Sequence, residues 1–72
     1  MNANHTIHIT TPYITLGQML KLAKLIGNGG EAKFFLMEAK VLVNDEPDAR
    51  RGRKLYPGDE VRVNGEAFRI EG

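Results

Sequence analysis

The chain contains no cysteine, and in a chain of only 72 residues this absence limits how a fold can be stabilised. Domains of this size lie near the lower limit for folding alone, and many depend on disulfides or a structural metal. Without cysteine there is neither a disulfide framework nor a thiolate zinc site. The two histidines, His5 and His8, could not hold a structural zinc by themselves. We therefore expect one domain over residues 1–72, stabilised by an apolar core and without a metal or other cofactor.

The first half of the chain predicts a strand followed by a helix. Residues 6–10 alternate polar and apolar side chains, which is typical of a half-buried strand. Thr15 and Gln18 have the spacing of a capping box, and the apolar pattern predicts a helix over 16–26. The glycines that follow this pattern would end the helix. The face of this helix opposite its core leucines would carry Gly17, Lys21, Lys24 and Asn28.

A second helix is predicted from Glu31 to about Lys40. Its core side would carry the residues that follow the i, i+3, i+4, i+7 spacing, which are Ala32, Phe35, Leu36 and Ala39. Lys33, Phe34, Met37 and Lys40 lie off that side.

The second half of the chain predicts several short strands. Asn64-Gly65 is the strongest short signal for a two-residue hairpin. Residues 45–48 predict a turn through Pro47, and residues 56–59 predict a tight turn before the hairpin. Strands are expected over 41–44, 61–63 and 66–70. The predicted fold class is therefore α+β, with two packed helices on a small antiparallel sheet.

Positive charge is unevenly distributed along the chain, although the net charge is only +1. Residues 1–30 contain two lysines and no acid. Four positive charges follow within five residues, at Arg50, Arg51, Arg53 and Lys54. Such a chain can present a basic face while its total charge stays near neutral. The alternative is a solvated loop in which these cations pair with Asp45, Glu46 and Asp48.

The residues needed for catalysis are missing from the sequence. Neither cysteine nor serine is present, which excludes a thiol nucleophile and a serine triad. The glycines of the stretch GNGGEAK precede a helix, where free amides can bind phosphate, but no Gly-Lys-Ser/Thr follows them. We interpret this stretch as a helix–helix turn, which could also touch an RNA phosphate. We expect no catalytic residue and no enzymatic activity.

No membrane or export segment is expected. No apolar run approaches the roughly 20 residues that span a bilayer. The first residues also lack a positive region followed by an apolar stretch, which argues against a secretory signal. We expect a cytoplasmic protein.

Residues 14–63 resemble the alpha-L RNA-binding motif, also described as the ribosomal S-four-type RNA-binding domain. The positions that carry this resemblance are Leu16, Leu20, Ala32, Lys33, Val41, Val43, Asn44, Gly58 and Asp59. The chain departs from the family pattern at Thr15, Gly17, Gly29, Gly30 and Ala39. Its shortness and its arginine-rich loop are most similar to stand-alone bacterial members of the YaaA or YbcJ type, which the family links to ribosome assembly.

The resemblance implies a non-catalytic, monomeric RNA-binding protein. Its expected partners are structured RNA, in particular ribosomal RNA, and ribosomal particles, with a role in ribosome assembly or translation. Phosphates would be held by Lys21, Lys24, Lys33, Lys40, Arg50, Arg51, Arg53 and Lys54. Phe34 and Asn44 would contact a base or sugar, because an exposed aromatic beside lysines can stack a nucleobase.

Other interpretations of these residues remain open. Phe34 could instead pack under the N-terminal strand or against Met37. The same surface could dock an acidic or ribosomal protein partner, which would make the chain a protein-interaction module. Charge alone would also permit DNA binding, and the chain could be a module detached from an RNA-modifying enzyme.

Overall fold

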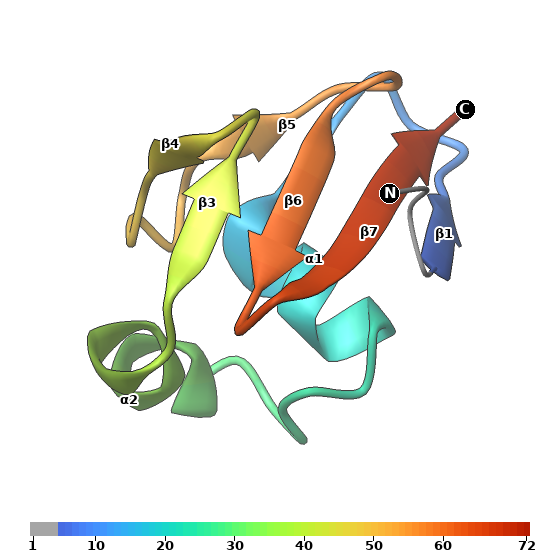
Figure 1. Cartoon of the computed structure of the whole chain (residues 1–72). Helices are drawn as coiled ribbons and strands as arrows, with labels where there is room; N and C mark the ends of the chain where they lie inside the picture. Colours follow the sequence, from blue (N-terminus) through green and yellow to red (C-terminus); the bar gives the residue numbers. More distant parts are fainter. Residues whose placement is uncertain (1–4) are drawn as a thin grey trace.

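The computed structural model describes residues 5–72, which form two helices and two sheets (Figure 1). The predicted domain range also includes residues 1–4, which lie outside the described residues. The helices are α1 (Leu16–Leu22) and α2 (Glu31–Glu38). The larger sheet has the order β1-β7-β6-β3-β4 and is formed by β1 (His5–His8), β3 (Val41–Val43), β4 (Glu46–Pro47), β6 (Glu60–Val63) and β7 (Glu66–Glu71). A separate two-stranded sheet pairs β2 (Ile14–Thr15) with β5 (Lys54–Leu55).

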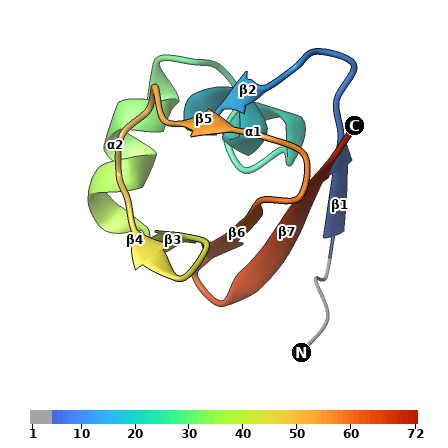
Figure 2. The same ribbon diagram turned by 90° about the horizontal axis from the view of Figure 1, so that it is seen from above.

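The fold class is α+β, as predicted. Within the larger sheet the strands pair antiparallel except at one edge, where β1 runs parallel to β7. Seen from above, α1 and the β2–β5 pair overlap, and both lie across a space from strands β6 and β7 (Figure 2). The core fills this space, and its largest fully buried side chains are Leu16, Met19, Leu20, Leu55, Ile70, Val43 and Val61. Each such side chain contributes about 1.5–3 kcal/mol to folding through burial alone.

Helix α1 begins where the sequence predicts it but ends earlier. The Gln18 N–H donates to the Thr15 hydroxyl at 3.3 Å, and the Thr15 N–H donates to the Gln18 side chain at 2.9 Å. The predicted capping box is therefore confirmed. The predicted end at residue 26 is wrong, because Lys24 adopts a left-handed conformation with φ of 61°. The helix therefore ends before Gly27, the first of the glycines expected to end it. After the turn at Lys24, the Ile26 side chain is buried in the core.

Helix α2 buries the side that its spacing predicts. Ala32 and Leu36 are buried, while Phe35 and Ala39 are partly buried against the core. The helix ends slightly earlier than predicted, because Ala39 has extended backbone angles that lead into β3.

Two turns of the second half confirm the sequence prediction and one corrects it. Asn64 and Gly65 both have positive φ and form the hairpin between β6 and β7. The 56–59 turn is closed by the Asp59 N–H, which donates to the Tyr56 carbonyl oxygen at 2.9 Å. The turn predicted over 45–48 lies instead at Asn44 and Asp45, with φ of 50° and 69°.

Pro47 therefore lies in a strand rather than in a turn. It pairs with Leu42 in β4, at the edge of the larger sheet, where a residue without an N–H is tolerated. The physical reason for the shift is that both residues of such a two-residue hairpin loop need positive φ, which Asn and Asp tolerate better than most side chains.

Neither helix is suited to cross a bilayer. Across residues 5–72, no helix is both long and apolar enough to do so.

Candidate nucleic-acid interface

Gly17 lies at the point where α1, α2 and the arginine-rich segment meet. Its N–H donates to the Arg51 carbonyl oxygen at 3.0 Å. A Cβ atom at this position would lie 2.9 Å from the Arg51 Cγ and 3.8 Å from the Ala32 Cβ. The N–H of the preceding residue, Leu16, donates to the Arg53 carbonyl oxygen at 2.8 Å. The backbone of residues 51–53 thus satisfies N–H groups at the start of α1, which have no partner inside the helix.

The prediction that Gly17 lies on an exposed face of the first helix is therefore wrong. Gly17 is buried, because the arginine-rich segment packs directly on the first turn of α1. Lys21 lies one turn further along the same side of this helix and is exposed.

Lys33 and Arg51 lie close together, although they are distant in sequence. They line one surface hollow together with Leu36, Met37 and Ala49. Figure 2 shows the chain between β4 and β5, which contains Arg51, running alongside α2. Lys21 lines another hollow and is connected to this site only through α1, one helical turn from Gly17. We use the name basic face for Lys33 and Arg51 together with Lys21, which come from three separate parts of the sequence.

Two other arginines of the segment are held by one carboxylate. Arg50 donates to both oxygens of Asp48, through Nε at 3.1 Å and Nη2 at 2.9 Å, and Arg53 donates to it through Nη1 at 3.0 Å. The Asp48 side chain is only 7% exposed, whereas that of Arg50 is 72% exposed. The hydrogen bond from Arg50 is the largest cause that holds the pKa of the Asp48 carboxyl well below its usual range.

This clamp confirms in part the alternative in which the cations of the segment pair with neighbouring acids. Asp48 fixes the orientation of two guanidinium groups and partly neutralises their charge. Arg51, in contrast, forms no ion pair with any of the described residues. We therefore expect Arg51 to be the arginine of this segment that is freest to bind a phosphate.

Lys54 lies beside two tyrosines that the sequence analysis did not single out. Its Nζ atom is 5.0 Å from the centroid of the Tyr13 ring. The ring centroids of Tyr13 and Tyr56 are 5.7 Å apart, and the rings are tilted by 47°. Both tyrosines adjoin the β2–β5 pair, since Tyr13 precedes Ile14 and Tyr56 follows Leu55. In the sequence, the one local feature that these two tyrosines share is an adjacent aliphatic residue, Ile14 or Leu55.

Three other predicted contact residues do not line the hollow of Lys33 and Arg51. Lys24 is exposed in the turn that ends α1. Lys40 lies between α2 and β3, where its N–H donates to the Asn64 side chain at 2.9 Å. The Asn44 side chain donates to Asp59 at 3.1 Å and accepts from the Glu60 N–H at 3.0 Å, so its amide is already used within the fold.

Phe34 is 69% exposed, so it is not buried under the N-terminal strand, which was one of the two alternatives to a base contact. It lines a different hollow from its neighbour Lys33, together with Glu31 and Glu38. These carboxylates disfavour a phosphate at that position.

The histidines offer no metal site within the described part of the chain. The His5 Nε2 atom is 2.8 Å from a carboxylate oxygen of Glu66, and its ring stacks on Phe68. Nowhere in residues 5–72 do three or more His, Cys, Asp or Glu side chains cluster as metal ligands would.

The sequence matches known proteins over most of its length. A family model described as S4 domain matches residues 7–71, from β1 to the last strand. A protein of Bacillus subtilis (strain 168), named "Probable ribosome maturation protein RlbA", is 66% identical over 59 residues. That alignment covers 82% of this chain and 83% of the relative.

Proposed function

The chain belongs to the S4 domain family, and from this premise we propose that it is a non-catalytic protein that binds structured ribosomal RNA. We propose that it acts in ribosome maturation, the role stated in the name of its relative from Bacillus subtilis. In this proposal the chain works as a single RNA-binding domain, as a monomer and in the cytoplasm.

The observation that carries the proposal is the shared hollow of Lys33 and Arg51. The two cations come from α2 and from the arginine-rich segment, and the segment is tied to α1 by the hydrogen bonds at Leu16 and Gly17. A backbone of phosphates needs several cations held at fixed positions, and three connected elements supply them here. Double-stranded RNA is bound mostly through its shape and its backbone, which suits a site with many cations and few base-reading groups.

A second candidate function is the docking of a ribosomal protein. It is favoured by one observation, the two apolar side chains that α2 exposes, Phe34 at 69% and Met37 at 74%. Exposed aromatic and methionine side chains are enriched at protein interfaces. Both candidates predict association with ribosomal particles, so only the chemistry of the bound component separates them.

A binding measurement with deproteinised ribosomal RNA distinguishes the two candidate functions. We expect the purified protein to bind this RNA with an affinity within about tenfold of its affinity for intact ribosomal particles, since the phosphate contacts supply most of the binding energy. The affinities would be measured by filter binding with labelled RNA. Arg51→Glu should weaken both interactions, whereas Arg69→Glu, on the exposed side of β7, should weaken neither.

The opposite pattern would support the second candidate. Binding to particles but not to deproteinised RNA, retained after ribonuclease treatment and unaffected by Arg51→Glu, would contradict the proposed function.

A further inference from the structure

Tyr13 and Tyr56 form an exposed aromatic pair with a fixed backbone. The two residues are 38% and 48% exposed, although each lies beside a core residue of the β2–β5 pair. The Thr11 hydroxyl donates to the Tyr13 carbonyl oxygen at 2.8 Å. The Tyr56 N–H donates to an Asp59 carboxylate oxygen at 2.8 Å. The pair is therefore preorganised, which reduces the entropy that a ligand would have to supply on binding.

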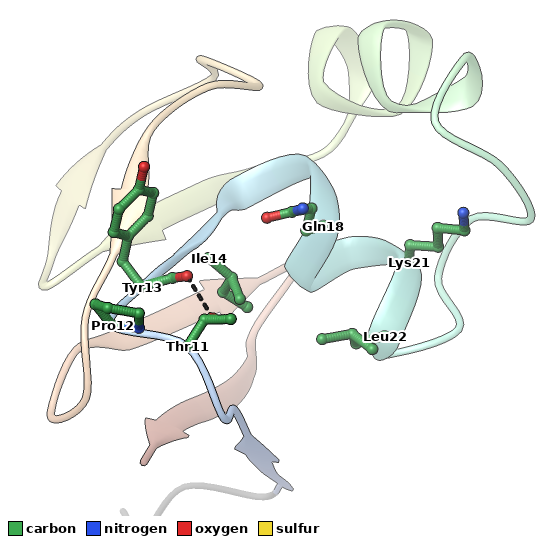
Figure 3. A pocket seen from close by; sticks show the side chains of 7 residues that line it. All are labelled: Thr11, Pro12, Tyr13, Ile14, Gln18, Lys21 and Leu22. Atoms are coloured by element: carbon green, nitrogen blue, oxygen red, sulfur yellow. Dashed lines mark hydrogen bonds between the residues drawn. The ribbon is translucent and has the colours of Figure 1, made fainter.

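The two tyrosines line two neighbouring surface hollows, one each, and each hollow contains at least one cation. Tyr13 lines the first one with Pro12, Ile14 and Gln18, and Lys21 and Leu22 lie on its opposite side (Figure 3). Tyr56 lines the second one with Arg50, Arg53 and Lys54. Asp59 also lines the second hollow, but its carboxylate accepts hydrogen bonds from the Tyr56 N–H and the Asn44 side chain.

The arrangement of cation, aromatic pair and cation matches the chemistry of a nucleotide chain. An unpaired base can stack on a tyrosine ring, and the phosphates on either side of it can bind cations in the two hollows. A base paired inside a helix cannot reach the rings, because its stacked neighbours cover both of its faces. An apolar peptide would gain nothing from the lysine and arginine side chains on both sides of the rings.

We propose that Tyr13 and Tyr56 form a stacking site for one unpaired nucleotide of the RNA, with Lys21 and Lys54 binding its flanking phosphates. This inference rests on the proposed function and adds to it the kind of RNA that is bound. The preferred ligand is then a helix that carries unpaired nucleotides, such as a bulge or a single-stranded tail, rather than a fully paired helix.

The chain itself supplies the readout for a test. It contains two tyrosines and no tryptophan, so all tyrosine emission comes from the proposed site. A hairpin RNA with a single-stranded tail would be titrated into the intact protein, with the same hairpin without the tail as the control. In both RNAs a non-nucleotide linker closes the loop, so that the tail holds the only unpaired nucleotides. We expect the tailed RNA to quench tyrosine emission at saturation and the untailed RNA to leave most of it unchanged. Free tyrosine in the same titration corrects for absorption by the RNA.

Variants of the pair test its contribution to affinity. The double variant Tyr13→Ala, Tyr56→Ala should bind the tailed hairpin about 10-fold more weakly, because each stacked base contributes roughly a 5- to 150-fold effect. Its affinity for the untailed hairpin should be unchanged, which also shows that the variant is folded. The matched variant Tyr13→Phe, Tyr56→Phe keeps both rings and should bind the tailed hairpin as the wild type does.

The result that would overturn the stacking site is equal affinity of the Ala and wild-type proteins for the tailed hairpin, with no quenching at saturation. If neither hairpin binds the wild-type protein, the proposed function itself is contradicted, and the stacking site is contradicted with it. If both hairpins bind equally well, RNA binding stands and the stacking site alone is refuted.

Discussion

Replacing both Lys33 and Arg51 by glutamate is expected to weaken binding of a hairpin RNA by about 100-fold at about 0.1 M salt. The two side chains line one hollow beside the start of α1, so the double replacement places two negative charges where phosphates are expected to lie. Each replacement removes one charge-assisted contact and adds a repulsion. Fluorescence anisotropy with a labelled RNA measures the loss directly.

The matched control is the double variant Arg62→Glu, Arg69→Glu, which changes the net charge by the same amount. In the antiparallel register, Arg62 lies opposite Ala67 and Arg69 lies opposite Glu60. Their strand neighbours Val61, Phe68 and Ile70 are buried, so both arginines lie on the other side of the sheet. We expect this variant to bind RNA within about threefold of the wild type, because charges beyond a Debye length contribute little. Equal weakening in both variants would mean that net charge, and not the basic face, determines the affinity.

Gly17→Val is expected to lower the free energy of unfolding by about 3 kcal/mol. Even a single Cβ atom at this position would lie 2.9 Å from the Arg51 Cγ and 3.4 Å from the Arg51 carbonyl oxygen. That carbonyl oxygen accepts the hydrogen bond from the Gly17 N–H, so the segment cannot move away without losing this bond. A branched side chain adds further atoms to the same space. Urea unfolding monitored by circular dichroism measures the difference.

Gly29→Val is the control for this substitution. Nothing lies within 4 Å of a Cβ atom at Gly29, and its φ is not in the left-handed region. Its stability should change by less than about 1 kcal/mol. The folded Gly17→Val protein should also bind RNA more weakly, because displacing the segment moves Arg51 away from Lys33. A Gly17→Val protein as stable as the wild type would show that the packing of the arginine-rich segment on α1 is not as described.

The features that the sequence predicts correctly depend on residues close together in the chain. The capping box of Thr15 and Gln18 spans one helical turn, and the Asn64-Gly65 hairpin depends on two residues. The buried positions of α2 follow from helical spacing alone. The early end of α1, before the left-handed Lys24, has no such local signal, since a lysine rarely adopts positive φ.

The site was less predictable because it depends on contacts between distant segments. By helical spacing alone, Gly17 fits an exposed position. It is buried because the chain at Arg51 packs against it. Likewise, Tyr13 and Tyr56 are brought together by the pairing of Ile14 with Leu55, which neither short strand predicts by itself. The grouping of Lys33 with Arg51 agrees with the expectation of a shared basic surface, but the hydrogen bonds that produce it could not be derived from charge spacing.

The salt dependence of RNA binding tests the central claim, that cations from separate segments bind phosphates together. If about five phosphates are engaged, the logarithm of the binding constant should fall against the logarithm of the salt concentration with a slope of roughly −3.5 to −4.5. The Lys33→Glu, Arg51→Glu protein should show a slope shallower by about 2, and the Arg62→Glu, Arg69→Glu protein should keep the slope of the wild type. A flat response in the wild type, or one slope shared by all three proteins, would contradict the account.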